Sequence, residues 1–330
     1  MIGKTSLMKH RVAPLLLPAL LLLPVFLPCH AEDQPGNLEV QFVKGLQNRT
    51  YYDLAEKHLK ALLTRTTEKT NKATYLFALA DNSEKTAKAV LSAPGVGTDS
   101  RLQLREGHLA KAEKSYRDVL KIAPKHESAT KARFAIGALL KQRATTLKRR
   151  WEKLESDMGR LAQPLDPKKK YTPEEEAKSK EDAPKRAELQ KNINAATKEA
   201  VKYLKEAISH LADLIKVRNT ELEKARKAAQ DAKEAKVLQR LDEERRLAEE
   251  EWVRARFELY QTQITLGEIL TVKNAEGKKN IESAAVGLKD INMGIYHKWV
   301  IGKYATMLEG HCYSLLGKYK IALKKFDENF

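Results

Sequence analysis

The stretch Gly310–Phe326 constrains the fold most, because its residues describe two short helices joined by a tight turn. Glycine and alanine let two helix backbones approach closely, and aromatic side chains fill the space beside the crossing. The turn falls at Gly317, and the second helix then presents Ala322 and Phe326 on one face. Small and aromatic residues stand at fixed offsets: Gly310, Tyr313, Gly317, Tyr319, Ala322 and Phe326. The spacing predicts an antiparallel helix pair.

Two other stretches carry the same offsets. In the first, Thr50 stands where the turn glycine would be, before Tyr52, Ala55 and Leu59. In the second, the step from Gly107 to Ala112 equals that from Gly317 to Ala322, which gives Gly107 the place of the turn glycine. The second stretch comprises Gly107, Leu109, Ala112, Tyr116 and Val119 and leads to Pro124, which ends the helix. The chain therefore contains several related helix pairs.

These offsets resemble those of the tetratricopeptide (TPR) repeat. The spacing departs from a strict array, because Ala55 and Ala112 are 57 residues apart where a period of about 34 is expected. We attribute this to an insertion near Pro94–Gly97, since solenoids tolerate insertions on one face. The resemblance implies a non-catalytic protein-interaction scaffold that binds partners on the concave side, lined by the first helix of each pair.

In the last repeat, that orientation would expose a stripe on the first helix, namely Tyr304, Met307, His311 and Ser314. We take these four residues as the candidate partner-binding face. The alternative is that Met307 simply packs beneath the next repeat.

The middle of the chain reads as long charged helices, because charged residues make up 32% of the sequence and glycine and proline are scarce. Helical spacing predicts one helix over 127–159 and another from Lys185, with a reversal within 228–238. Between them we expect a polar linker, 160–184, with Thr172-Pro173 as a helix start and Pro184 as a restart. Glu276-Gly277 should break the next helix, with a further helix over 279–295.

The predicted fold is all-α: a TPR-like helical-hairpin solenoid with a long charged coiled-coil hairpin in the middle. The expected boundaries are 1–31 for a signal peptide, 32–140 for TPR-like repeats, 141–272 for the charged helices and 273–330 for further repeats, incomplete at the C-terminus. The order resembles secreted bacterial TPR proteins in which a charged helical hairpin follows an early repeat block.

Residues 1–31 resemble a secretory signal, with a basic start, an apolar run over Val12–Leu27, and the small residues Cys29 and Ala31 at the −3 and −1 positions before a cut. Prolines interrupt the run, and it is shorter than the roughly 20 residues of a spanning helix, so we favour export over membrane anchoring. The mature protein would be periplasmic or extracellular. Cleavage removes three basic residues and lowers the formal net charge from +17 to about +14. It leaves Cys312 alone, as a small buried residue or a reactive thiol.

The sequence contains no recognisable catalytic, cofactor-binding or metal site. No two of the six remaining histidines have metal-ligand spacing with a carboxylate, and no cysteine pair remains. We expect no enzyme activity, no small-molecule substrate and other proteins as partners. The alternative is a basic rod that binds an anionic envelope polymer or membrane surface through Lys148-Arg149-Arg150 and Lys168-Lys169-Lys170. Nucleic acid is disfavoured, because no aromatic residues alternate with these basic runs.

Overall fold

The computed structural model describes residues 35–93, 95, 97–166, 169–231, 234–293, 296 and 300–328. These residues form α-helices and connecting segments without a strand, which confirms the all-α prediction. In chain order the helices are α1 (Pro35–Asn48), α2 (Tyr52–Arg65), α3 (Lys69–Leu91), α4 (Thr98–Ile122), α5 (Glu127–Gly159), α6 (Pro173–Asp231), α7 (Ala235–Leu270), α8 (Ala275–Met293), α9 (Val300–Leu315) and α10 (Tyr319–Asp327).

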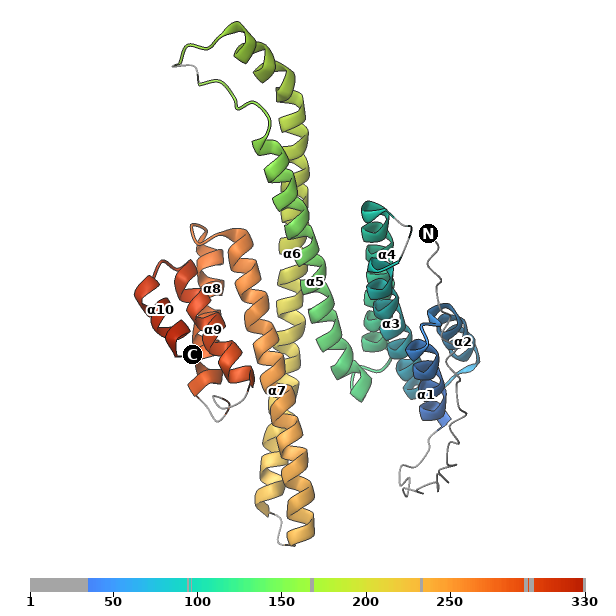
Figure 1. The fold of residues 1–330 in the computed structure, drawn as a ribbon. Helices are drawn as coiled ribbons and strands as arrows, with labels where there is room; N and C mark the ends of the chain where they lie inside the picture. Colours follow the sequence, from blue (N-terminus) through green and yellow to red (C-terminus); the bar gives the residue numbers. More distant parts are fainter. Residues whose placement is uncertain are drawn as a thin grey trace, which may run out of the picture.

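Each helix packs against the helices before and after it in the sequence, from α1 at one end of the molecule to α10 at the other (Figure 1). The odd-numbered helices also contact one another in order, α1 with α3, α3 with α5, α5 with α7 and α7 with α9. The backbones of the even-numbered helices lie farther apart in the described part of the chain, and long side chains link them, Arg117 of α4 to Glu206 of α6 and Lys205 of α6 to Glu276 of α8. The odd-numbered helices therefore form a continuous row.

The long helices lie where the apolar spacing places them. α5 has the predicted bounds, and its first turn is capped by His126, whose Nδ1 accepts a hydrogen bond from the Ser128 amide at 3.3 Å. The reversal between α6 and α7 follows Asp231, inside the predicted window. With 59 residues, α6 is about 90 Å long. It packs along both α5 and α7 and so links the two halves of the molecule.

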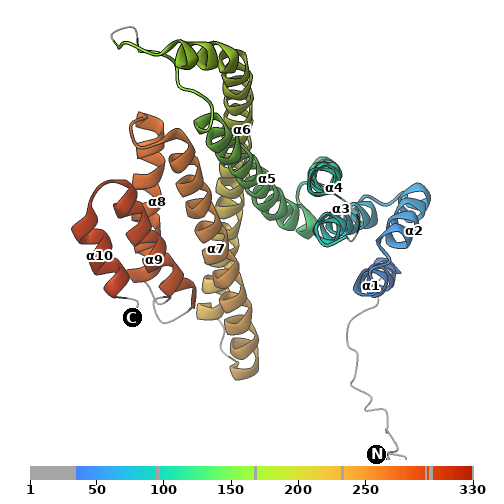
Figure 2. The same cartoon turned by 45° about the horizontal axis from the view of Figure 1, so that its top comes forward.

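The predicted linker is shorter than expected, because α6 begins at Pro173 and Pro184 lies inside it. Thr172 and Glu175 form a capping box, in which the Glu175 carboxylate accepts from the Thr172 amide at 2.8 Å. The prediction of a restart at Pro184 was wrong. A proline inside a helix removes one hydrogen bond and bends the helix, and α6 is bent in its N-terminal part (Figure 2). The Asp182 carboxylate anchors this part by accepting from the Ala162 amide at 3.0 Å.

Two glycines predicted to interrupt helices lie within them. Gly107 is in the middle of α4, so the turn expected there is absent. Gly277 belongs to the first turn of α8, where the Asn274 side chain caps the helix by accepting from the Glu276 amide at 2.8 Å. A Cβ on Gly277 would lie 2.3 Å from the Thr271 carbonyl oxygen. This glycine therefore permits close approach to the preceding turn and does not break the helix.

Two of the helix pairs, α1–α2 and α9–α10, share one turn geometry. In α9–α10, Gly317 has φ +73°, its amide donates to the Ser314 carbonyl at 3.0 Å, and the Lys318 amide donates to the Tyr313 carbonyl at 2.8 Å. This is the Schellman arrangement that commonly ends a helix. In α1–α2, Thr50 has φ 63° and makes the equivalent bond to Gln47 at 2.9 Å. The predicted equivalence of Thr50 and Gly317 is confirmed.

In both pairs the two helices cross closely, but the sizes of the residues at the crossing differ between the pairs. At the α9–α10 crossing, a Cβ on Gly310 would lie 2.8 Å from the Phe326 ring, so glycine is needed beside this aromatic residue. At the equivalent positions of α1–α2, the buried Val43 and Leu59 share one apolar cluster. The predicted close approach at Gly310 is confirmed.

Among the described residues, none of the helices is both long and apolar enough to span a membrane. The signal segment, 1–31, lies outside the described residues, and export remains a prediction. Cys312 is a free, fully buried cysteine in α9, as expected for a small packing residue. Burial raises the pKa of its thiol to about 12.

Candidate partner-binding face

The four residues predicted to bind a partner lie along α9 with different surroundings. Tyr304 and Met307 are large exposed side chains, whereas His311 and Ser314 are half-buried. The Ser314 carbonyl is engaged in the turn to α10. Tyr304 and Met307 therefore offer the accessible apolar surface of this stripe.

Glu268 of α7 links His311 of α9 to Lys148 of α5. The His311 Nε2 lies 2.8 Å from one carboxylate oxygen of Glu268, and the other oxygen accepts from the Lys148 ammonium at 2.7 Å. The hydrogen bond with His311, with support from Lys148 and against the effect of burial, lowers the pKa of Glu268. An ionised carboxylate thus connects α5, α7 and α9.

Similar polar contacts join other neighbours in the row of odd-numbered helices. Lys141 of α5 pairs with Glu258 of α7 and donates to Gln261 at 2.8 Å. Nearer the N-terminus, Lys85 of α3 donates to Gln47 of α1 at 2.7 Å. These residues were missed in the sequence, although Lys141 and Lys148 are seven apart, as are Gln261 and Glu268. A shared heptad spacing with complementary polarity is the signal that could have found them.

The surface between α7 and α9 is hollowed beside the exposed stripe. A shallow hollow of about 460 Å³ is lined by Arg246, Glu250, Val253, Val300 and Ile301. Tyr304 and Met307 continue from Val300 along α9 at helical spacing. We call the hollow together with Tyr304 and Met307 the α7–α9 groove.

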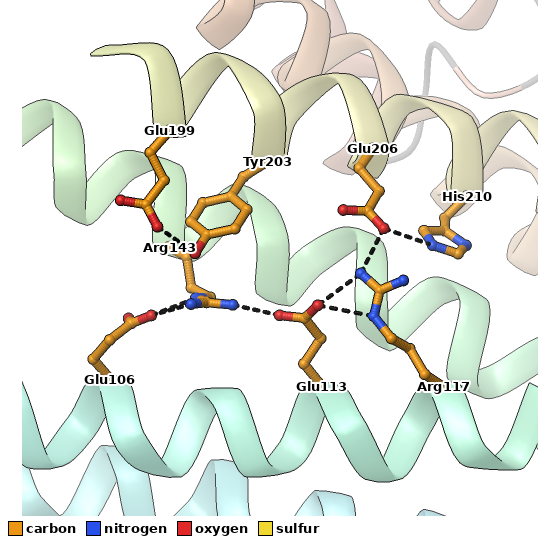
Figure 3. Close-up of polar contacts among 8 residues, drawn as sticks. All are labelled: Glu106, Glu113, Arg117, Arg143, Glu199, Tyr203, Glu206 and His210. Carbon is orange, nitrogen blue, oxygen red and sulfur yellow. Dashed lines mark hydrogen bonds and ion pairs between the residues drawn. The ribbon is translucent and has the colours of Figure 1, made fainter. Parts of the chain in front are cut away.

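A second group of polar residues lies where α4, α5 and α6 meet (Figure 3). The Arg143 guanidinium of α5 is held between Glu106 and Glu113 of α4 and lies 4.3 Å from the centre of the Tyr203 ring of α6. Arg117 of α4 adds contacts of 2.6 Å to Glu113 and 2.5 Å to Glu206 of α6. The group joins α4 to α5 and α6.

The chemistry of this group is that of a structural joint. Burial, reinforced by Arg117, lowers the pKa of His210, which lies 3.9 Å from Glu206. Burial and the hydrogen bond to Glu199 raise the pKa of Tyr203. These shifts favour the neutral imidazole and the protonated phenol, and the carboxylates shown are paired with arginines or with the phenol. The pairs of Arg143 with Glu106 and Glu113, and of Arg117 with Glu206, each join two different helices.

The residues predicted to define the repeats range from fully buried to exposed. Pro124 follows two residues after the end of α4, as a helix stop should. Tyr313 is half-buried, but Tyr319 at the start of α10 is exposed, so only one of the two tyrosines fills the crossing. The predicted small and aromatic residues with buried side chains are Ala55, Ala112, Tyr116 and Ala322.

The basic runs proposed for anion binding are partly engaged within the protein. Lys148 is paired with Glu268, while Arg149 and Arg150 are exposed, as are Lys169 and Lys170. Lys168 lies outside the described residues. The run at 148–150 therefore offers less free charge than its sequence suggests.

Comparisons with known proteins do not assign this chain to a family: no family model matches it, and searches of curated proteins and of solved structures find no match. In the described ranges, no three His, Cys, Asp or Glu side chains are grouped so that they could hold a metal ion. The fold and the face described above define the class: an all-α protein of sequentially packed helix pairs.

Proposed function

We propose that this protein is a non-catalytic extracytoplasmic scaffold of TPR-like helix pairs, which holds a protein partner in the α7–α9 groove. The observation that carries the proposal is the row of odd-numbered helices, in which polar contacts join α1 to α3, α5 to α7 and α7 to α9. On α9 this row exposes the large apolar side chains of Tyr304 and Met307. In a TPR-like solenoid the first helices of the pairs line the concave binding side, and here the odd-numbered helices are the first helices.

The groove favours a partner segment that brings an apolar side chain to Tyr304 and Met307. An aromatic ring and a thioether are adaptable contact groups, and interfaces are enriched in both. The adjoining Arg246 and Glu250 lie 3.3 Å apart and supply a polar edge that a partner's backbone can use. The polar contacts of Glu268 keep α7 and α9 in register, so the groove is fixed before binding.

The test is site-specific photo-crosslinking at position 304, carried out in the exported fraction of the source organism. We expect a defined protein adduct that survives high salt and is lost when Met307 is changed to Ala. The matched control carries the same probe at Val286, an exposed apolar residue of α8, and should give no such adduct. Absence of an adduct at 304, or equal adducts at both positions, would contradict the proposal.

The same experiment addresses the basic-rod alternative. Binding through exposed charges is screened by salt, so an association with an anionic polymer or membrane should disappear above about 0.3 M salt. It should also be unaffected by Met307→Ala and reduced by removing Arg149 and Arg150. Retention of the partner at high salt therefore separates the two functions.

A further inference from the structure

Arg105 of α4 is a buried arginine without a charged partner. It is 8% exposed, and its guanidinium donates one hydrogen bond, from Nη1 to the Thr146 hydroxyl of α5 at 2.9 Å. The Arg105 Nε atom is buried and has no acceptor within the described part of the chain. Thr146 in turn donates to the Gln142 carbonyl at 3.0 Å. The Thr146 hydroxyl therefore orients the guanidinium but cannot neutralise its charge.

Three other arginines with mostly buried side chains are paired differently. Arg143, Arg218 and Arg256 have side chains that are 12%, 16% and 16% exposed, and each forms an ion pair with at least one carboxylate. Glu106, which follows Arg105 in the sequence, contacts Arg143. Among the described residues, Arg105 has no ion pair of its own. Since burying an unpaired charge is unfavourable, the position favours an added negative charge.

A second arginine lies beside this position on α5. Arg149 comes three residues after Thr146, so the two side chains share one face of the helix. Arg149 is exposed, and in the described ranges no hydrogen bond or ion pair engages it. Burial lowers the pKa of Arg105; the charge of Glu106 opposes this effect, and the charge of Arg149 adds to it. Two positive charges therefore lie near each other where α4 and α5 diverge, in the N-terminal half of α4 (Figure 1).

We propose that Arg105 and Arg149 form a binding site for a divalent oxyanion, a phosphate or sulfate group, between α4 and α5. Guanidinium groups match the oxygens of such a group, and two positive charges favour a dianion over a single carboxylate. Thr146 is a positioning residue, because its hydroxyl proton is already donated to Gln142. The site shares no residue with the α7–α9 groove, so it does not depend on the proposed partner. It also differs from a diffuse basic surface, because it requires the buried Arg105.

The test is isothermal titration calorimetry of the full chain with inorganic phosphate at about pH 8, where phosphate is largely a dianion. We expect saturable binding at a single site. Arg105→Gln and Arg149→Gln should each weaken this binding about tenfold or more, because each removes charge-assisted hydrogen bonds. The matched control is Arg150→Gln, which removes the next exposed arginine of the same run and should change the affinity less than about twofold. Absence of saturable binding, or an equal loss in Arg150→Gln, would overturn the proposal.

Thermal unfolding separates a loss of the site from a loss of the fold. Arg105→Leu should raise the Tm of the free protein, because it removes an unpaired buried charge. The same variant should lose the increase in Tm that phosphate gives the natural protein. If Arg105→Leu lowers the Tm and keeps the phosphate-dependent increase, Arg105 is a structural residue and the proposal is wrong.

Two further titrants define the ligand. Methyl phosphate is also largely a dianion at this pH, so it should bind like inorganic phosphate if the natural ligand is a phosphate group carried by a larger molecule. Binding of inorganic phosphate without methyl phosphate would identify the free ion as the ligand. Acetate carries one charge and should bind about tenfold more weakly or less. Acetate binding as tight as that of phosphate would contradict a site for a dianion.

Discussion

The pairs α1–α2 and α9–α10 reach one backbone geometry with different residues. Both first helices end in the same hydrogen-bonded turn, once with Thr50 and once with Gly317 in the left-handed conformation. Both crossings are filled, once by Val43 and Leu59 and once by Gly310 beside Phe326. The comparison teaches that the close packing of a crossing depends more on the summed volume of its two side chains than on which helix carries the larger one.

The largest expected effect comes from placing the residue of one crossing into the other. Gly310→Val should destabilise α9–α10 by about 2–3 kcal/mol, because its side chain would overlap the Phe326 ring. Adding Phe326→Leu recreates the Val43–Leu59 combination and should restore most of that loss. Hydrogen exchange of the α9 and α10 amides measures the local free energy of opening. If the double variant is no more stable than Gly310→Val, the two crossings are not equivalent.

A smaller loss is expected from exchanging the turn residues in the unfavourable direction. Gly317→Thr forces a β-branched residue into the left-handed region and should cost about 1–2 kcal/mol. The amides of α10 should exchange faster, while those of α1 and α2 provide the internal reference. An unchanged exchange rate would mean that the turn tolerates either residue and stores no strain.

The reverse exchange should stabilise the other pair. Thr50→Gly relieves the left-handed strain at Thr50, offset in part by the greater freedom of glycine in the unfolded chain, for a net gain of about 0.5–1 kcal/mol. The amides of α1 and α2 should exchange more slowly. Thr50→Ala serves as the control, because it keeps a side chain at this position and should recover little of the gain.

The smallest expected effect is a difference between the two pairs in how the stability of each depends on pH. Burial, against the pull of Lys325 at 3.4 Å, raises the pKa of Glu309, whose equivalent in α1 is Phe42. The folded state therefore favours the protonated carboxyl, and its stabilising contribution is lost as pH rises from the ordinary value of 4.5 through the raised pKa. Local opening of α9–α10 should become easier over this interval in the natural protein and should change less in Glu309→Gln.

The difference between these two proteins isolates Glu309, because Glu268 is present in both. The lowered pKa of Glu268 acts in the opposite direction, since its contribution is lost as pH falls. In α2, Glu56 has a pKa lowered chiefly by its hydrogen bond with Lys60, so that helix should also weaken as pH falls. Equal pH profiles for the natural protein and Glu309→Gln would refute a titrating role for this buried carboxyl.

Helix boundaries were predictable where local chemistry decides them. The capping box of Thr172 and Glu175 needs only residues three apart, and the bounds of α5 follow from its own apolar spacing and flanking residues. The close approach at Gly310 was also predictable, because only a residue without a side chain fits beside an aromatic ring at that spacing. Each of these features depends on contacts within a few turns of the chain.

Of the candidate face, the sequence indicated the stripe on α9 but not the polar row that supports it. Lys148 was interpreted as part of a basic run, whereas it is paired with Glu268, 120 residues away in the sequence. Such pairs depend on how far each helix slides along its neighbour. Spacing within one helix does not fix that register.

The sequence by itself determined that this protein is helical and where most of its turns fall, because caps and apolar spacing act locally. Only the tertiary structure decided which of Gly107 and Gly317 forms a turn and which lies inside a helix, although both stand five residues before a buried alanine. A Cβ on either glycine would meet no neighbour, but Gly317 turns the chain with a positive φ. The helix around Gly107 continues and is held to α5 by the Arg105–Thr146 hydrogen bond of 2.9 Å and by the Glu106–Arg143 contact. A helical glycine costs about 1 kcal/mol, and contacts with α5 outweigh that cost.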